Sequence, residues 1–389
     1  MFAFVACLRR ALIAWACGAS QTELYGAYCP AWALSWSYRR QNLLRELLSY
    51  GADILCLQEA RFGSRYRPRI ATDSRLWRPQ IQSDHFDDFF APELARAGYS
   101  AVYKRKTEAV YTGSAYAIDG CATFFRKDSF SLIKKYEVEF NKAAGSLAES
   151  VGPPGARDKA LSRLMKNNVA LILVLEAMNA TAPPGAMGGA AKRQLLCVAN
   201  THIHANPELN DVKLWQVHTL LKGLEKIAAS AEIPMVVSGD FNSIPGSAAH
   251  CLLSTGRVEP GHPELATDPL GILRPSSKLC HGLPLSSAYA TAARPDAGGG
   301  ADGAARERLR ERLDVGGTGE PRFTNCTRDF VGTLDYLFFT RDSLAPTALL
   351  ELPDEAALRG PRGTGALPSA VASSDHVALM AAFAWAPRR

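Results

Sequence analysis

The sequence lacks the cysteine patterns of zinc-bound or disulfide-linked small domains. Its 389 residues include nine cysteines, an odd number, but no Cys-Xaa-Xaa-Cys pair and no zinc-type ligand spacing. Cys56, Cys121 and Cys197 lie inside apolar, strand-like runs, where a thiol behaves as a small hydrophobic core residue. We therefore expect free thiols and a reducing compartment.

Long apolar segments and repeats are also missing after the amino terminus. No segment beyond residue 20 has the roughly 20 apolar residues that a transmembrane helix needs, and no leucine-rich or other repeat is present. Residues 1–20 contain Arg9 and Arg10 followed by ALIAWACGA, which is close in composition to a signal peptide. A buried first strand and an incorrectly assigned first exon are the alternative interpretations.

The composition is that of a globular chain with a sizeable core, at 47% hydrophobic and 21% charged residues. A net charge of +6 and a pI near 8.8 fit a polyanionic partner without demonstrating one. We expect one domain over residues 24–389, preceded by an atypical segment at residues 1–23. Three low-complexity insertions, interpreted as surface loops or disordered segments, lie near residues 143–160, 181–191 and 297–319.

The most informative stretch is IPMVVSGDFN, residues 233–242. Its β-branched apolar run after Pro234 predicts a buried strand that ends at a polar site. Asp240 and Asn242 place a carboxylate and a carboxamide at the strand end, a pair that suits a hard cation and a phosphate. A strand followed by a simple Asx-type turn is the alternative interpretation.

Other elements follow from the same kind of pattern. Leu43 and Leu47 are part of an amphipathic helix expected over residues 38–50 and ended by Gly51. Further helices are expected over residues 84–97 and from Asp211, and strands over residues 52–60, 120–125, 168–176, 195–204, 333–340 and 377–385. This mixture favours a layered α/β or α+β domain.

Several polar residues end or interrupt the expected strands. Acidic and histidine side chains without cysteine ligands suit magnesium or manganese, which indicates phosphate chemistry. Asp335 with His376 is the candidate pair for proton transfer. Alternatively, Asp375 is only a turn residue, Phe330 a core residue and His204 a surface or core residue. The full candidate set is Glu59, His202, Asp240, Asn242, Asp335, Asp375 and His376.

Five motifs, in one order along the chain, resemble the endonuclease/exonuclease/phosphatase superfamily. They are RRQNLLRELLSYGADILCLQEA (39–60), NTHIHANPELNDVKLWQ (200–216), SGDFNSIP (238–245), FTNCTRDFVGTLDYLFF (323–339) and SSDH (373–376). Three further segments resemble the catalytic domain of carbon-catabolite-repressor-type mRNA deadenylases. These are YGAYCPAWALSWSYRR (25–40), DHFDDFFAPEL (84–94) and GCATFFRKDSF (120–130).

The resemblance implies a fold and a metal site. The fold is an α/β, deoxyribonuclease I-like, four-layer sandwich of two mixed, mostly antiparallel β-sheets flanked by helices. The site lies where the loop ends of the sheets form a cleft. Glu59, Asp240 and Asp375 are the implied metal ligands. We expect magnesium, with manganese as the alternative, and two ions.

The same resemblance assigns roles to further residues. Asp240 would orient or deprotonate the attacking water, and Asn242 would donate a hydrogen bond to the phosphate. His202 would contact the scissile phosphate, while Asp335 and His376 would handle protons. Pro207 and Phe330 match positions that sandwich an adenine, and stacking on an aromatic ring contributes ~1–3 kcal/mol per base.

One family feature is missing. The first strand of the family ends in an Asn that helps to build the metal site, and its place falls around residues 13–15, yet no Asn precedes Asn42. Either the enzyme is weakened, by ~10–100-fold if outer-shell deletions are a guide, or the first exon is incorrectly assigned. We favour the second interpretation because the other motifs are intact. It would also remove the signal-peptide interpretation.

The predicted function is magnesium-dependent 3′-to-5′ removal of poly(A) tails from mRNA with release of 5′-AMP. Expected partners are poly(A) RNA and a deadenylase complex, although the leucine-rich repeats through which some family members dock are absent. The expected location is the cytoplasm, with the nucleus as a further site and no membrane association. Alternatives are a related 2′,5′-phosphodiesterase or nucleotide phosphatase, and a weakened or inactive poly(A)-binding scaffold.

Overall fold

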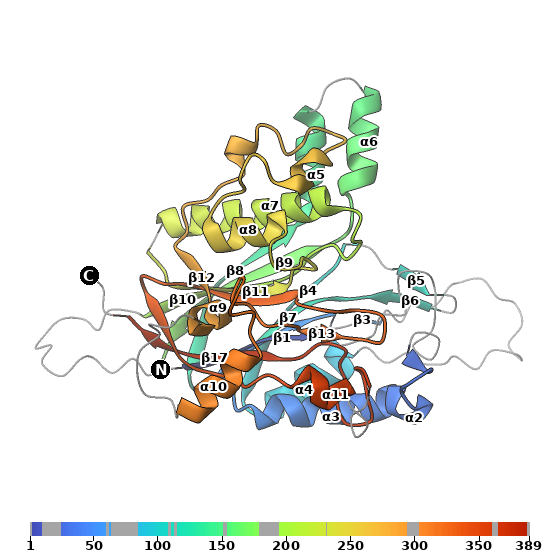
Figure 1. Cartoon of the computed structure of the whole chain (residues 1–389), viewed down its shortest axis with the longest axis vertical. Helices are drawn as coiled ribbons and strands as arrows, with labels where there is room; N and C mark the ends of the chain where they lie inside the picture. Colours follow the sequence, from blue (N-terminus) through green and yellow to red (C-terminus); the bar gives the residue numbers. More distant parts are fainter. Residues whose placement is uncertain are drawn as a thin grey trace, which may run out of the picture.

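The computed structural model describes residues 2–9, 25–59, 62–63, 85–107, 110–112, 115–150, 154–178, 194–230, 232–293, 303–359 and 365–386. Two six-stranded sheets stack face to face, and helices cover the outer face of each sheet (Figure 1). The predicted four-layer sandwich is confirmed. Each sheet has one parallel pair of strands near its centre and is otherwise antiparallel.

The first sheet runs in the order β16 (Leu344–Leu349), β17 (Leu379–Trp385), β1 (Phe2–Arg9), β2 (Ile54–Gln58), β7 (Gly120–Arg126) and β4 (Tyr99–Arg105). Its outer face carries α3 (Trp36–Ser49), η1 (Phe86–Phe90) and α4 (Ala91–Arg96), shown below the sheet in Figure 1. Leu43, Leu47 and Leu94 pack there against Leu55 and Phe124. The predicted helix over residues 38–50 is therefore present, and Gly51 follows it with the positive φ of 58° that suits glycine.

The second sheet runs in the order β12 (Leu285–Ser287), β15 (Asp335–Thr340), β11 (Met235–Asp240), β10 (Leu195–His202), β9 (Val169–Ala177) and β8 (Phe130–Glu139). Helices α7 (Asn210–Ser230) and α8 (Ala248–Thr255) cover it, and Leu220, Leu224 and Leu252 pack onto Val237 and Phe338. Between the sheets lies a second core that includes Ile54, Leu173, Val198, Val236 and Phe339. Because both faces of β9 and β11 are covered, residues 169–175 and 235–237 are continuously apolar rather than alternating.

The remaining described elements are short and lie around the sheets. They include α2 (Ala31–Leu34), α9 (Ala288–Ala293), α11 (Glu355–Arg359), the 3-10 turns η2 (Pro263–Ala266) and η3 (Ser276–Lys278), the hairpin of β13 (Asn325–Cys326) and β14 (Val331–Gly332), and the small sheet of β3 (Phe62–Gly63), β6 (Ala115–Ile118) and β5 (Val110–Thr112). Within the described ranges, no helix combines the length and the apolar character that crossing a membrane requires.

The prediction of loops or disorder is wrong in part for two of the three insertions, because both contain helices. Residues 143–160, predicted as a loop, lie mostly in α5 (Phe140–Ser150) and α6 (Pro154–Leu164), where Ala144 and Ala160 are fully buried. Alanine is the strongest helix former, so an Ala-rich segment folds once its small face has a surface to pack on. Within 297–319, α10 (Gly303–Glu311) leads into a turn anchored by the buried Leu313. Residues 181–191 lie outside the described part of the chain.

Residues 2–9 of the amino-terminal segment form a β-strand, as in the first-strand interpretation. β1 pairs in parallel with β2 and antiparallel with β17. Arg9, its last residue, is the Cα partner of Gln58, the residue before Glu59. Residues 13–15, where the resemblance places the missing Asn, lie outside the described residues.

Candidate active site

The register of the second sheet aligns three of the predicted site residues. His202 at the end of β10 is the Cα partner of Asp240 at the end of β11, and Asp240 is the partner of Asp335 at the start of β15. All three side chains are buried, at 4%, 0% and 0% exposure. Adjacent strands thus place two carboxylates and an imidazole in one row, which is why a strand-end pattern in the sequence identifies them.

Asp335 binds His376 directly, as the sequence predicted for this pair. The distance from His376 Nδ1 to Asp335 Oδ2 is 2.6 Å, and both side chains are buried. The Thr324 hydroxyl donates to the same Oδ2 at 2.6 Å and accepts from the backbone N–H of Asp335. Asn325, the next residue, bridges the backbone of His376. These contacts fix the imidazole with Nδ1 towards the carboxylate.

Asp240 is held by the turn that follows it. Its Oδ1 accepts a hydrogen bond from the Asn242 backbone N–H at 2.9 Å, which is the Asx-type turn of the alternative interpretation. Its Oδ2 lies 3.6 Å from His202 Nε2. The turn and the cluster therefore coexist. Glycine at position 239 lets the backbone of β11 lie close to that of β10, because a Cβ there would lie 2.1 Å from the Thr201 carbonyl oxygen.

Asn242 has a φ of 47°, which asparagine tolerates better than most residues. Its side-chain Nδ2 donates to the Ile203 carbonyl at 2.8 Å, and its own carbonyl accepts from Lys213 Nζ at 2.7 Å. Lys213 is buried on α7. Burial lowers the pKa of its ammonium, and the charge of Asp240 opposes that shift. Lys213 thus fixes the turn and adds positive charge beneath the two site residues.

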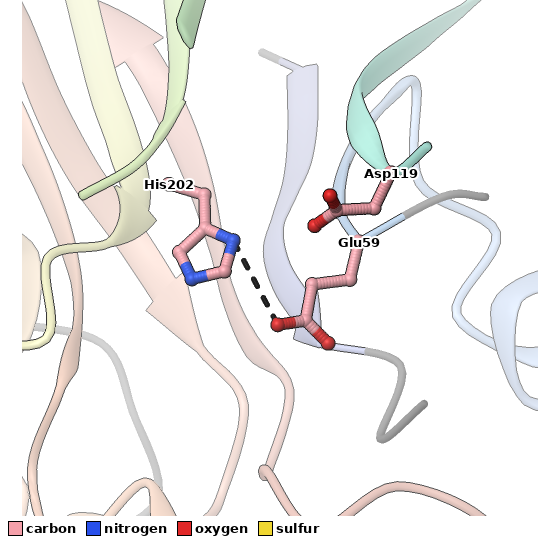
Figure 2. A group of neighbouring side chains, drawn as sticks. All are labelled: Glu59, Asp119 and His202. Atoms are coloured by element: carbon pink, nitrogen blue, oxygen red, sulfur yellow. Dashed lines mark ion pairs between the residues drawn. The ribbon is translucent and has the colours of Figure 1, made fainter. Parts of the chain in front are cut away.

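Glu59 reaches the same region from the first sheet. It follows β2 with a φ of 56°, and its Oε1 lies 3.8 Å from His202 Nδ1 (Figure 2). Asp119, immediately before β7, completes a group in which one ligand atom of each residue lies within 4.8 Å of the others. We call Glu59, Asp119 and His202 the bridging group, because they join the two sheets. Asp240, Asp335 and His376, which meet the same distance criterion, form the sheet group.

Lys106 balances the acids of the bridging group. Its Nζ lies 2.7 Å from Asp119 Oδ2. Burial lowers the pKa of this ammonium, but the charges of Asp119 and Glu59 outweigh that effect and raise it. A lysine ammonium therefore lies next to the carboxylates of the bridging group.

A buried polar network lies beneath the bridging group. Asn200 on β10 donates to the carbonyls of Leu57 at 3.2 Å and Ala122 at 3.0 Å, both in the first sheet. It accepts from Gln58 Nε2 at 2.7 Å. Because Gln58 precedes Glu59, this contact sets the position of Glu59 relative to His202.

The remaining predicted residues are not members of either group. Asp375, expected as a metal ligand, belongs to neither group among the described residues, and its Oδ2 accepts from the Tyr25 hydroxyl at 3.1 Å. Pro207 and Phe330, expected to sandwich a base, are both exposed, Phe330 by 39%. Sequence reasoning missed Asp119, Lys106, Thr324 and Lys213. Asp119 had a signal, as an acid directly before an apolar strand.

The residues present fit a hard divalent cation. The bridging group offers two carboxylates and an imidazole, and the sheet group offers two buried carboxylates on adjacent strands. Such oxygen-rich sets suit magnesium or manganese, and no cysteine ligand belongs to either group. Two fully buried carboxylates side by side also call for compensating positive charge. Glu59, Asp119 and Asp240 are the acids that would hold the cation.

Fold and site together define a class. The chain belongs to the endonuclease/exonuclease/phosphatase family, whose model matches residues 17–376. It is 56% identical over 369 residues to carbon catabolite repressor protein 4 homolog 2 of Arabidopsis thaliana, which covers 95% of this chain and 56% of that protein. It is 29% identical over 388 residues to the CCR4-Not complex 3′-5′-exoribonuclease subunit Ccr4 of Schizosaccharomyces pombe, covering 93% of this chain and 46% of that protein.

A solved structure agrees with the family assignment. The crystal structure of ANGEL2, a 2′,3′-cyclic phosphatase, in complex with adenosine-2′,3′-vanadate is 26% identical, with a TM-score of 0.64 over 98% of this chain and 95% of that chain. The family resemblance and the fold predicted from the sequence are confirmed. The chain spans little more than half the length of its Arabidopsis relatives.

Proposed function

We propose that this chain is a magnesium-dependent 3′-to-5′ exoribonuclease that shortens poly(A) tails and releases 5′-AMP. The observation that carries the proposal is the position of His202. Its two ring nitrogens lie 3.8 Å from Glu59 Oε1 and 3.6 Å from Asp240 Oδ2, so one imidazole connects both groups of acids. The names of the relatives, which include an exoribonuclease subunit, support the reaction class.

The reaction defines what the side chains must do. Release of 5′-AMP requires water to attack phosphorus while the bond to the upstream 3′ oxygen breaks, so one proton leaves the water and one reaches that oxygen. Asp240 orients the water and accepts its proton. His376 presents Nε2 to the leaving oxygen, because Asp335 holds Nδ1. His202 and Asn242 contact the phosphate, as the resemblance implies.

Positive charge completes the site. A bound magnesium ion would polarise the phosphoryl oxygens and stabilise the charge of the transition state. Lys213 and Lys106 add fixed charge close to Asp240 and Asp119. Pro207 and Phe330 hold the terminal adenine, which their exposure allows. We also propose a deadenylase complex as partner, because relatives are named as subunits of one.

The test compares products from several substrates. Purified chain is incubated with 5′-labelled oligo(A), 2′,5′-oligoadenylate, NADPH and adenosine 2′,3′-cyclic phosphate, each with magnesium or with a chelator. We expect 5′-AMP from oligo(A) with magnesium only, and none from the Asp240→Asn variant. Oligo(A) that stays intact would reject the proposal.

A second candidate function is a 2′,3′-cyclic phosphatase, favoured by the likeness to ANGEL2 over 98% of this chain. Its signature would be opening of the cyclic phosphate without shortening of oligo(A). A poly(A)-binding scaffold would instead bind labelled oligo(A) without any turnover, and Asp240→Asn would not change that binding.

A further inference from the structure

A cavity of about 520 Å³ lies next to the candidate active site and has no role in the preceding reaction. Its volume is in the range that nucleotide-sized ligands occupy. The turn after β11 forms one side, and the segment from the end of α10 to Arg322 forms another. Its lining includes Ile244, Pro245, Arg310, Val315, Arg322 and Gly332. We call it the α10 cavity.

Chain connectivity ties the α10 cavity to the site. Ile244 follows Asn242 by two residues, and Thr333, also in the lining, precedes Asp335 by two residues. Gly332 ties it to Phe330, because a Cβ at Gly332 would lie 2.8 Å from the tip of the Phe330 ring. The ring proposed to hold the terminal adenine therefore stands at the edge of this cavity.

The chemistry of the lining suits one unit of a polyanion. Arg310 and Arg322 contribute two guanidinium groups, against one carboxylate, Asp314, which accepts from the Thr318 backbone N–H at 3.0 Å. Ile244 and Val315 are 53% and 43% exposed, which is unusual for such apolar side chains. Guanidinium groups bind phosphate oxygens well, and the apolar side chains offer contact to a base.

A second basic cavity, of about 650 Å³, lies beside α6 and fits less well. It includes Lys159, Arg163 and Lys166. The Arg163 guanidinium is already bound to Asp211 by two hydrogen bonds, at 2.6 and 2.9 Å. Lys166 Nζ donates to the Ser162 carbonyl at 3.1 Å. Arg163 and Lys166 are therefore already bound within the protein. Among the described residues, the Arg322 side chain makes only a long hydrogen bond, from Nε to the Leu313 carbonyl at 3.4 Å.

We propose that the α10 cavity binds the nucleotide of single-stranded RNA that lies on the 5′ side of the scissile phosphate. Arg310 and Arg322 contact its phosphate, and Ile244 and Val315 contact its base. The direction follows from the reaction: the removed residue is 3′-terminal and sits at Phe330, so the rest of the strand leaves the site on the 5′ side. This inference rests on the proposed exoribonuclease function.

The experiment compares a long and a short substrate. Arg310→Ala, Arg322→Ala and Val315→Asp are measured with hexa-adenylate and di-adenylate. We expect each arginine variant to raise KM for hexa-adenylate by about tenfold, the effect of losing one charge-assisted contact. Val315→Asp should also raise it, because it replaces an apolar contact to the base with a negative charge that repels the phosphate. The preference for hexa-adenylate over di-adenylate in kcat/KM should fall accordingly. Lys159→Ala and Lys166→Ala, in the cavity beside α6, are the matched controls and should behave as the unmodified protein.

A salt titration of binding separates phosphate contacts from loss of structure. Labelled hexa-adenylate is bound in the presence of a chelator, and the slope of log affinity against log salt should fall by about 0.7 for each arginine removed. Arg322→Lys, which keeps the charge, should restore most of the slope. Val315→Asp changes an exposed side chain, so the test stands even if Arg322→Ala does not fold.

The outcomes distinguish this inference from the proposed function. If the unmodified protein shortens hexa-adenylate and the arginine variants match it in KM and salt slope, the cavity assignment is wrong while the enzyme assignment holds. If only the Lys159 and Lys166 variants bound hexa-adenylate more weakly, the cavity assignment would also be wrong, because the RNA would then lie along α6. If no adenylate is cut at all, the proposed function fails, and the binding slopes still decide the cavity.

Discussion

The sheet group and the bridging group have similar chemistry but are assembled differently. Asp240 and Asp335 of the sheet group are Cα partners on neighbouring strands of one sheet, so strand register alone brings these two together. Glu59 and His202 of the bridging group come from different sheets, so they meet only when the sheets stack correctly (Figure 2). His376 joins the pair of Asp240 and Asp335 from the segment before β17, where Asn325 and Asp335 hold it. The bridging group depends on the packing between sheets, including the contact of Asn200 with Gln58.

This difference suggests a division of labour in the proposed reaction. The sheet group carries the hydrogen-bonded pair of Asp335 and His376 and would move protons. The bridging group carries carboxylates balanced by Lys106 and, together with Asp240 of the sheet group, would hold the cation. Variants in the two groups should therefore fail in different ways, and the following predictions run from the largest expected effect on turnover to the smallest.

Loss of the proton-handling pair should have the largest effect. We expect His376→Ala and Asp335→Asn each to lower kcat on oligo(A) by about 10³-fold at any magnesium concentration, a size typical of lost general acid–base catalysis. Single-turnover release of 5′-AMP measures the effect. Thermal unfolding of each variant checks that the fold is intact. A deficit that extra magnesium repairs would place the pair among the cation's ligands instead and would erase the contrast between the groups.

Glu59→Gln should fail in the other way. We expect about a 100-fold loss of activity at low magnesium, the upper end of the range for altered metal-site residues, and a partial recovery as magnesium rises. Binding of Mn²⁺ followed by electron paramagnetic resonance reads the affinity directly, without turnover. Equal losses at low and high magnesium, with unchanged Mn²⁺ affinity, would contradict the assignment of Glu59 to the cation.

Asp119 and Lys106 should shift the same affinity in opposite directions. Asp119→Asn removes a carboxylate and should weaken Mn²⁺ binding by about tenfold. Lys106→Met removes an ammonium 2.7 Å from Asp119 and should strengthen binding by a smaller factor. Calorimetric titration of the metal into both variants measures this. If Asp375→Asn weakened binding more than Asp119→Asn, the ligand set implied by the resemblance would be correct and the bridging group would be a structural ion-pair cluster.

The way each group is built also explains what the sequence revealed. Asp240, His202 and Asp335 end or begin apolar strands, and strand ends are visible as a pattern. Asp119 and Lys106 directly flank β7 and β4, the next two strands after β2 in the first sheet, so strand register brings them near Glu59. Their relation to His202 has no local pattern in the sequence, because it depends on how the two sheets stack.

The missed helices have a related cause. α8 is only eight residues long and is mostly apolar, with Ala248, Ala249, Leu252 and Leu253 all buried, so its pattern is too short to distinguish a helix from a strand. The sequence does contain signals for both ends of this helix. Ser247 caps its start by accepting a hydrogen bond from the His250 N–H, and Gly256 ends it with a φ of 82°. The alanine, glycine and proline content of α5 and α6 predicts a loop. The positions of these residues along the segment are compatible with the two helices that the structure has.

Substitution of His204 should have the smallest effect on turnover. It tests whether the catalytic residues extend beyond the bridging group. His204 lies two residues beyond His202, but it belongs to neither group among the described residues. Burial, followed by the charges of Lys166, Lys213 and Lys106, lowers the pKa of His204 to about 4. The folded protein therefore keeps this imidazole neutral at pH values where the unfolded chain, with an ordinary histidine pKa near 6.5, takes up a proton.

The sign of the pH effect follows from that depressed pKa. The stability associated with neutral His204 is present above pH 6.5 and is lost as pH falls towards 4, because protons then favour the unfolded chain. His204→Gln removes this loss of stability at low pH. The free energy of unfolding of the variant, relative to that of the unmodified protein, should therefore rise by on the order of 1 kcal/mol as the pH falls from 6.5 to 4.5. Urea unfolding across this range measures the gain. Turnover at pH 7 should change less than about twofold, as expected for a substitution outside both groups. A large loss of turnover with unchanged metal affinity would instead extend the catalytic machinery along the loop after β10, and His202 would no longer mark its limit.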